Sequence, residues 1–210
     1  SLTQGHVQEA PYYLSDNTPV VRAIIPSSTL SRFENDPAIY RIEETDFFNV
    51  DATQDAMVDL EDLGLDSSVD LDQLPIVAVL DSGVTFPEAL SSLIVQKWVA
   101  PNSGGGDGDH GTKVASRVAF KYINQQLPSS TIIPRTRIFD CNILDGSVPV
   151  NVFIQRIQAA VNAYSDTVKI YNLSANATSP IEGDEMSLVG YELDALQLRK
   201  GVQFFVSAGN

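Results

Sequence analysis

The sequence is short of cysteine and histidine, and each shortage excludes a kind of site. Cys141 is the only cysteine, so the chain has neither an intramolecular disulfide nor a zinc site built from cysteines. His6 and His110 are the only histidines, which leaves few imidazole groups for acid–base chemistry. Because Cys141 lies within the apolar run 137–143, we expect it to be a buried structural thiol and not a nucleophile.

Basic residues and long apolar runs are also scarce. No apolar stretch approaches the roughly 18 residues that a membrane-spanning helix needs. The chain has 13 Lys and Arg residues but 27 Asp and Glu residues, which gives a net charge of −14 and a pI near 4.3. A surface this acidic repels the phosphates of DNA and RNA. We therefore expect a soluble protein whose partner is neither a membrane nor a nucleic acid. No targeting pattern lies at the start, so the compartment stays open.

The sequence does contain enough apolar material for a folded core, since 43% of its 210 residues are hydrophobic. It divides near residue 74. More than half of the acidic residues precede this point, and residues 1–74 lack a regular alternation of strands and helices. We interpret residues 1–74 as an acidic accessory or linker segment. Within it we predict two strands and one short helix, over Pro19–Pro26, Ala38–Ile42 and Ala56–Leu63.

Residues 75–210 have the pattern of an α/β protein. Five short apolar segments predict strands, over Ile76–Leu80, Leu93–Ala100, Arg137–Ile143, Val168–Leu173 and Val202–Ser207. Their continuous apolarity indicates burial on both faces, as in a parallel sheet covered by helices. Apolar residues at helical spacing predict helices over His110–Ile123, Val150–Tyr164 and Met186–Lys200. This alternation predicts a three-layer, doubly wound parallel sheet preceded by an accessory segment.

Polar residues gather where the predicted strands end and one predicted helix begins. Asp81 directly follows the first strand, His110 opens the helix after a glycine-rich loop, and Asn210 follows the last strand. In a parallel sheet, ligands and catalytic groups collect at the carboxyl ends of the strands. An aspartate, a histidine and an asparagine therefore fall where an active site is expected.

Four motifs around these residues resemble those of the subtilisin-like serine proteases, and they occur in that family's order. The segment 76–84 (IVAVLDSGV) resembles the strand of the catalytic aspartate, and 109–115 (DHGTKVA) resembles the histidine motif. Segment 171–174 (YNLS) resembles a cleft strand, and 205–210 (FVSAGN) resembles the motif of the oxyanion asparagine. The resemblance covers residues 75–210 and implies a subtilisin-like fold that is incomplete at its carboxyl end.

The resemblance implies a role for each residue in the hydrolysis of polypeptides. Asp81 would orient His110, and His110 would be the general base and then the general acid. Asn210 would donate its side-chain amide to the oxyanion of the tetrahedral intermediate. Leu173, Ser174 and Ala175 would form one wall of the substrate cleft, whose backbone edge pairs with an extended peptide. No cofactor and no metal site is predicted.

Several residues depart from the family's pattern. Lys113 replaces a second histidine, Ser116 replaces a glycine, and 174–176 (SAN) stands where the family often has Ser-Leu-Gly. The nucleophilic serine of the family lies in a Gly-Thr-Ser motif beyond the oxyanion asparagine, and this motif is not in the 210 residues. We therefore expect the serine to follow Asn210 in the parent protein and the 210-residue chain alone to be inactive.

Two other functions compete with this one. The first is a non-catalytic subtilase-like module that binds peptides or a partner protein. The second is a dinucleotide site, because 106–111 (GDGDHG) fits G-x-G-x-x-G before a helix. We reject the dinucleotide site because Asp107 and Asp109 would repel a pyrophosphate. Residues 1–74 could be a remnant of an inhibitory propeptide, a linker or a docking domain, and the sequence leaves these alternatives open.

Overall fold

A computed structural model describes residues 6–50, 64–121, 126, 131–178 and 186–207 of the chain. Its centre is a five-stranded sheet with the order β14-β12-β7-β10-β8, in which every neighbouring pair is parallel. The strands are β7 (Ile76–Asp81), β8 (Ile94–Val99), β10 (Arg137–Asn142), β12 (Ile170–Leu173) and β14 (Gln203–Val206). Strands β8 and β10 lie on one side of β7, and β12 and β14 lie on the other, so the order reverses at β7.

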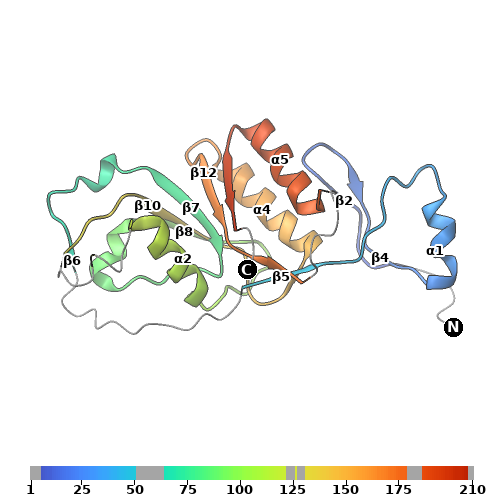
Figure 1. The fold of residues 1–210 in the computed structure, drawn as a ribbon, viewed down its shortest axis with the longest axis horizontal. Helices are drawn as coiled ribbons and strands as arrows, with labels where there is room; N and C mark the ends of the chain where they lie inside the picture. The colour runs from blue at the N-terminus through green and yellow to red at the C-terminus, as the bar shows by residue number, and fades with distance from the viewer. Residues whose placement is uncertain (1–5, 51–63, 122–125, 127–130, 179–185, 208–210) are drawn as a thin grey trace.

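Three helices cover the two faces of this sheet and complete three layers (Figure 1). Helix α2 (Asp109–Ala119) packs on one face, where its alanines meet Val79 and Ile138. Helices α4 (Val150–Tyr164) and α5 (Leu188–Lys200) pack on the other face. Helices switch faces where the strand order reverses, because parallel crossovers are right-handed. The prediction of an α/β fold with a doubly wound parallel sheet is confirmed.

The two edge strands differ from the prediction of burial on both faces. Strand β8 has no buried residue, and on β14 Phe205 and Val206 are 57% and 54% exposed. The central strands β7 and β10 behave as predicted, with five of six residues buried in each. Continuous apolarity therefore predicted which segments are strands but not which strands lie at an edge, because position in the sheet depends on the order of the strands.

The helix boundaries follow local signals. Helix α4 spans the residues predicted for it, and α5 begins after Ser187, whose hydroxyl accepts a hydrogen bond from the Gly190 N–H. Helix α5 ends at Gly201, whose φ of 60° lies in the left-handed region. Helix α2 ends at Ala119, earlier than predicted, because Phe120 adopts an extended conformation.

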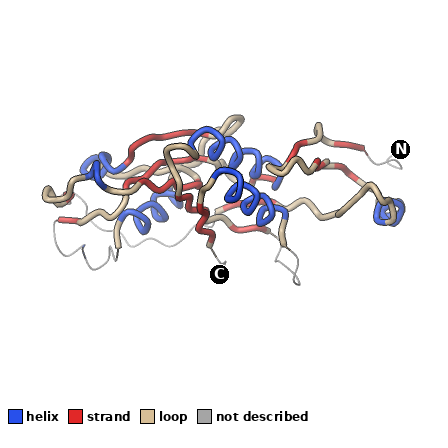
Figure 2. The backbone as a smooth tube through the Cα atoms, turned by 90° about the horizontal axis from the view of Figure 1, so that it is seen from above, coloured by secondary structure: helices blue, strands red, loops and turns tan. Residues whose placement is uncertain are grey.

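Residues 6–50 form small elements beside the helical layer of α4 and α5. Two short antiparallel pairs come first: β1 (His6–Val7) with β4 (Ala23–Ile24), and β2 (Tyr12–Tyr13) with β3 (Pro19–Val20). The predicted single strand over Pro19–Pro26 is therefore wrong, since β3 and β4 pair with different partners. Helix α1 (Ser27–Glu34) lies at one end of the elongated molecule, apart from the sheet (Figure 2).

The remaining predictions for the first 74 residues have mixed outcomes. The strand predicted over Ala38–Ile42 is absent, because these described residues form no regular element and Tyr40 is 99% exposed. The helix predicted over Ala56–Leu63 lies outside the described residues. After that gap come β6 (Gly64–Leu65), which pairs in parallel with β9 (Thr131–Ile132), and a 3-10 turn at Leu71–Gln73. A second 3-10 segment, Glu88–Leu93, leads into β8.

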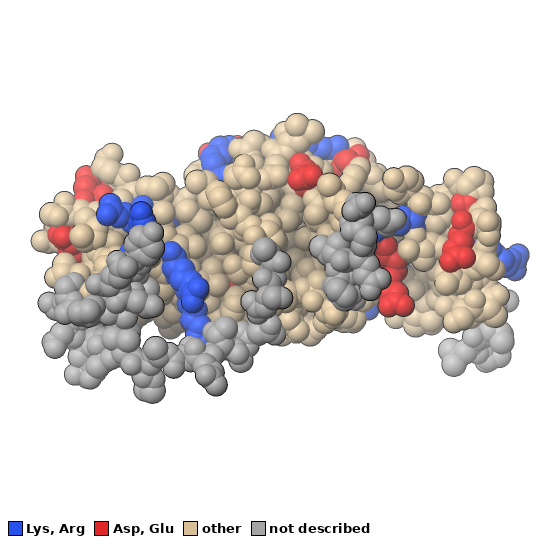
Figure 3. All heavy atoms as spheres, viewed as in Figure 1, with Lys and Arg blue, Asp and Glu red and all other residues tan. Residues whose placement is uncertain are grey.

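On the face shown in Figure 3, acidic and basic side chains are scattered among neutral ones and no single-sign patch dominates the described atoms. Within the described ranges, no helix combines the length and the apolar character that crossing a bilayer requires.

Candidate active site

Asp81 lies at the carboxyl end of β7, in the middle of the sheet. Side chains alternate along a strand, so Asp81 shares a face with Val79, which packs beneath α2. The strand order reverses beside β7, and such a switch point is where open α/β sheets place their ligand sites. The Asp81 side chain is completely buried, although it is a carboxylate. A buried carboxylate needs hydrogen-bond donors close by.

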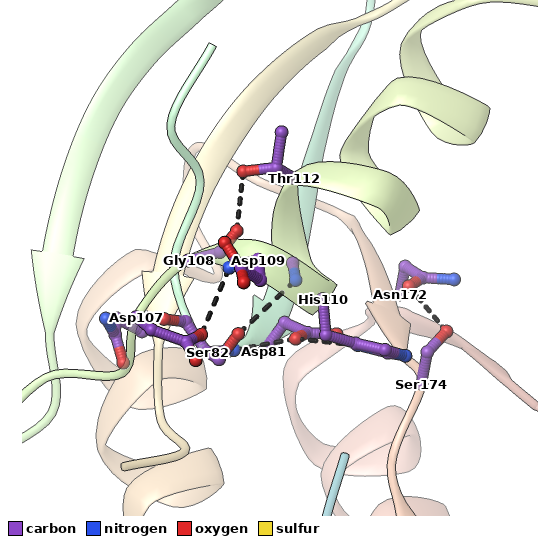
Figure 4. Close-up of polar contacts among 11 residues, drawn as sticks. Asp81, Ser82, Asp107, Gly108, Asp109, His110, Thr112, Asn172 and Ser174 are labelled. Carbon is purple, nitrogen blue, oxygen red and sulfur yellow. Dashed lines mark hydrogen bonds and ion pairs between the residues drawn. The ribbon is translucent and has the colours of Figure 1, made fainter. Parts of the chain in front are cut away.

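His110 supplies one of these donors from the first turn of α2. Its Nδ1 atom lies 3.0 Å from both carboxylate oxygens of Asp81, and the Ser82 backbone N–H donates to Oδ1 at 2.7 Å (Figure 4). Because the carboxylate can only accept, Nδ1 carries the proton and Nε2 is left with its lone pair. The His110 side chain is 20% exposed, so solvent or a substrate can reach it.

Burial raises the pKa of the Asp81 carboxyl, and the hydrogen bonds from Ser82 and His110 oppose this rise. The charged form of Asp81 is therefore supported by its immediate neighbours rather than by water. In the view of Figure 4, the His110 ring extends away from Asp81 on the side where Asn172 and Ser174 lie. The pair can therefore accept a proton at Nε2 and stabilise the resulting imidazolium through Asp81.

The Gly-Thr that follows His110 fits α2 closely against the loop after β7. A Cβ atom on Gly111 would lie 2.1 Å from the Gly83 carbonyl oxygen, so a side chain there would force the two segments apart. The Thr112 hydroxyl donates to the Gly108 carbonyl at 2.6 Å and accepts from the Thr85 N–H at 2.8 Å. Gly111 and Thr112 thus help to set the distance between the helix start and the end of β7.

Asn142 also lies at this edge, and the sequence analysis did not identify it. It ends β10 and pairs in register with Asp81, so both side chains are on the α2 face. Its Nδ2 donates to the Ser82 carbonyl at 3.0 Å, and its Oδ1 accepts from the Gly106 N–H at 3.1 Å. One signal could have revealed it: Asp140 and Asn142 are polar at alternate positions of an otherwise apolar strand.

The predicted cleft wall follows β12. Leu173 is buried and its carbonyl accepts a hydrogen bond from the Ser207 N–H at 3.2 Å, while Ser174 and Ala175 are half-buried. The Ser174 hydroxyl donates to Asn172 Oδ1 at 3.1 Å. Asn210 lies outside the described residues, so its predicted position beside this wall stays a prediction.

An extended segment from the N-terminal region lies next to this wall. Strand β5 (Phe47–Asn49) pairs antiparallel on one side with β11 (Val148–Pro149), which follows β10. On its other side it pairs antiparallel with β13 (Asn176–Ala177), which follows β12. On this side, β5 therefore pairs with residues 176–177, which directly follow the predicted wall 173–175.

Strand β5 is held by backbone bonds and by one aromatic side chain. The Val150 N–H donates to the Asp46 carbonyl at 2.8 Å, and the Thr178 N–H donates to the Phe47 carbonyl at 3.0 Å. Phe48 is 9% exposed and stacks on Phe153 of α4 with ring centroids 4.3 Å apart. Strand β5 is thus the middle strand of a three-stranded antiparallel sheet, and its Phe48 side chain packs into the core beside α4.

Two further predictions concern the chemistry of the site. Cys141 is completely buried and desolvation raises the pKa of its thiol, which confirms that it is a buried structural thiol. Among the residues that the structure describes, no group of three or more His, Cys, Asp or Glu side chains is arranged to hold a metal ion.

Comparison with known proteins places this arrangement in a family. The sequence model of the subtilase family, Peptidase_S8, matches residues 72–210. The searches of curated proteins and of solved structures gave no match. The matched range contains the parallel sheet, the Asp81–His110 pair and the predicted cleft wall, and it begins within the 3-10 turn before β7. The chain therefore belongs to the subtilase family.

Proposed function

We propose that this protein is a serine endopeptidase whose Asp-His-Ser triad consists of Asp81, His110 and a serine that follows Asn210. The observation that carries the proposal is the Asp81–His110 pair, in which Nδ1 lies 3.0 Å from both oxygens of a buried carboxylate. Membership of the subtilase family supports peptide bonds as the substrate class. The 210 residues without the serine would not cleave peptides.

In this mechanism, His110 moves protons and Asp81 holds it in place. Nε2 takes the proton of the serine hydroxyl while the serine oxygen forms a bond to the scissile carbonyl carbon. The carbonyl oxygen becomes an oxyanion, to which the Asn210 amide donates. His110 then passes its proton to the leaving amine as the carbon–nitrogen bond breaks. Water, activated by His110 in the same way, hydrolyses the acyl-enzyme.

The substrate would lie where β5 lies. We propose that residues 6–50 are an accessory segment that covers the groove between β11 and β13, with Phe48 in the apolar pocket beside Phe153. The hydrogen bonds of β5 run to the backbone on both sides, so an extended peptide of different sequence can make them equally well. A substrate would have to displace β5 before it reaches the wall formed by Leu173, Ser174 and Ala175.

The test is fluorophosphonate labelling of the natural protein with the sequence that follows Asn210. We expect labelling at one serine, and we expect Asp81→Asn and His110→Ala to abolish it. Asn210→Ala should lower kcat by about 10²–10³-fold while the protein still labels slowly, a magnitude taken from the subtilisin asparagine. Failure of the folded wild-type protein to label would overturn the proposal.

The second candidate function is a peptide- or partner-binding module without catalysis, and the β5 groove favours it. This reading predicts that a peptide with the sequence of residues 45–50 binds a chain from which residues 1–50 have been removed. It also predicts that the natural protein with the sequence that follows Asn210, here called the extended protein, neither labels with fluorophosphonate nor hydrolyses that peptide. Binding together with hydrolysis would favour the peptidase.

A further inference from the structure

Three segments that are separate in sequence meet around the Asp81–His110 pair. They are the end of β7 with Ser82, the loop from Gly106 that leads into α2, and Asn142 at the end of β10. We infer that Asn142 is a positioning residue that holds the first two segments together, so that His110 meets Asp81 in the geometry that proton transfer needs. This inference rests on the proposed peptidase function.

The hydrogen bonds of Asn142 close a ring. Its Nδ2 donates to the Ser82 carbonyl, and its Oδ1 accepts from the Gly106 N–H. The Gly108 N–H also donates to the Ser82 carbonyl, at 3.1 Å. The Ser82 carbonyl is therefore joined to the glycine-rich loop twice, once directly and once through the asparagine side chain. His110 follows Gly108 by two residues, so this ring sets the start of α2 relative to the end of β7.

The ring is packed without spare room. A Cβ atom on Gly83 would lie 2.6 Å from Asn142 Nδ2, and one on Gly106 would lie 2.4 Å from the Ser82 carbonyl oxygen. Asn142 itself is 8% exposed. Because the space around it is this tight, a shift of the asparagine side chain would displace the two backbone segments as well.

The chemistry of the ring requires an amide side chain. Asn142 must donate to one backbone group and accept from another at the same time, and an amide does both with fixed geometry. A carboxylate at this position would accept from Gly106 but would face the Ser82 carbonyl without a proton to donate. An alanine would leave the Gly106 N–H without its partner. In both cases the loop loses one of its two connections to the end of β7.

Asn142 makes its hydrogen bonds to the backbone of Ser82 and Gly106. Its effect is therefore on the separation of Asp81 and His110 and not on substrate binding. Displacements of about 1 Å in catalytic groups lower rates by about 10²-fold. We expect Asn142→Ala and Asn142→Asp to lower kcat by about 10- to 100-fold in the extended protein, with KM within about twofold of the wild-type value. Asn151→Ala is the matched control, because Asn151 is a buried asparagine that bonds instead to Glu9.

A readout that does not need catalysis separates this inference from the proposed function. His110 is one of two histidines, so its Nδ1 proton can be assigned by NMR in the 210-residue chain with His6→Gln as the reference. We expect this proton to exchange with water at least tenfold faster in Asn142→Ala and Asn142→Asp than in the wild type or Asn151→Ala. Asn142→Asp keeps the volume of the side chain, so it carries the test if the alanine variant does not fold.

Each outcome decides one of the two claims. Unchanged exchange of the Nδ1 proton in a folded Asn142 variant would overturn the positioning role. So would rapid exchange of the Gly106 and Gly108 amides in the wild-type chain, which needs no variant. A wild-type extended protein that shows the protected Nδ1 proton but hydrolyses no peptide would overturn the peptidase function and leave the positioning role supported. A fall in kcat equal to that of Asn151→Ala would count against Asn142.

Discussion

The strand-end site and the N-terminal segment are built in opposite ways. The site around Asp81 lies at the middle of a sheet, and its segments are joined by buried hydrogen bonds, several of them between backbone groups. Residues 6–50 attach through the backbone bonds of β5 to β11 and β13 and through side chains that contact α4 and α5. Their buried apolar anchors are Leu14 and Phe48. The site is therefore set by the centre of the sheet, whereas the segment adds two apolar side chains to one side of the core.

The polar contacts of the segment are individually well formed. The Ser15 N–H donates to Glu192 Oε2 at 2.8 Å, and Asn151 Nδ2 donates to Glu9 Oε2 at 2.6 Å. Glu192 is completely buried, so Ser15 and Gln158 replace the water that its carboxylate would otherwise bind. Ser15 and Gln158 both donate to Glu192, so these contacts form a small network on the helical layer, separate from the one that surrounds Asp81. The segment should therefore come away without unfolding the sheet.

The largest expected effect concerns the site. Asp81→Asn should lower kcat of the extended protein by about 10⁴-fold, the size of effect found when a triad aspartate is replaced in serine proteases. The free energy of unfolding should not fall, because burial raises the pKa of Asp81 and a neutral amide avoids the cost of a buried charge. Peptide hydrolysis and urea unfolding measure the two quantities. A loss of stability that matches the loss of rate would contradict this separation.

The next largest effects are expected for the two stacked rings of Phe153 and Phe48, which differ in what their removal should unfold. Phe153→Ala should lower the free energy of unfolding of the whole domain by about 3–5 kcal/mol, since Phe153 is completely buried in the core. Phe48→Ala should instead release residues 6–50, with faster amide exchange in that segment and unchanged exchange in β7 and β10. Hydrogen exchange resolved by residue distinguishes the two variants. Faster amide exchange in β7 and β10 of the Phe48→Ala variant would contradict this prediction, because it would show that residues 6–50 and the sheet unfold together.

A third prediction concerns the charge pair of Asp145 and Arg156, which secures the loop after β10. Arg156 Nη1 lies 2.7 Å from Asp145 Oδ1, and its hydrogen bond lowers the pKa of this carboxyl to about 2. Since the folded pKa lies below the unfolded value near 3.9, the stabilisation is complete above about pH 4 and is lost as the pH falls toward 2. We expect Asp145→Asn to cost about 2 kcal/mol at neutral pH.

The control for Asp145 is an exposed pair in the same domain. Asp72 lies 2.9 Å from Arg137 but its side chain is 87% exposed, so water screens the interaction. Urea unfolding of Asp145→Asn and Asp72→Asn between pH 2 and pH 7 tests the difference. Asp145→Asn should be less stable than the wild type at pH 7 and nearly equal to it at pH 2. A constant difference at all pH values would refute the role of ionisation.

The smallest expected effect is in the segment. Glu9 is 42% exposed and lies 3.1 Å from Arg22, so Glu9→Gln should change stability by less than about 1 kcal/mol. Its hydrogen bond from Asn151 can persist with the amide oxygen. Amide exchange in residues 6–24 measures the change. Loss of the whole segment from the domain would mean that this single charge, and not Phe48, anchors it.

Much of the fold could be predicted because its signals are local. The apolar runs of β7 and β10, the helical spacing of α4 and the glycine after α5 are each read over a few residues, and these elements lie where they were predicted. Asp81 and His110 were identified for a similar reason, since each follows or opens a recognisable element and carries a motif. The edge strands and the two hairpins near the start were not predicted, because their partners are distant in sequence.

The role of Asn142 and the position of β5 could not be predicted from the sequence. Asn142 is an ordinary polar residue until the pairing of β10 with β7 places it in register with Asp81. Residues 47–49 are an unremarkable short run until β11 and β13, about 100 and 130 residues later, accept their backbone. Neither fact can be read from spacing along the chain.

Histidine and cysteine are scarce in this chain, and the few that it has could be assigned from the sequence. The sequence alone determined that His110 is the one histidine set in a chemical motif, that Cys141 belongs to the core, and that residues 75–210 alternate strands with helices. The tertiary structure decided which side chains meet His110, which strands are edges, and where the acidic N-terminal segment lies. The reason is physical: local propensity and apolar periodicity act over a few residues, whereas strand order and register bring together groups that are far apart in the chain.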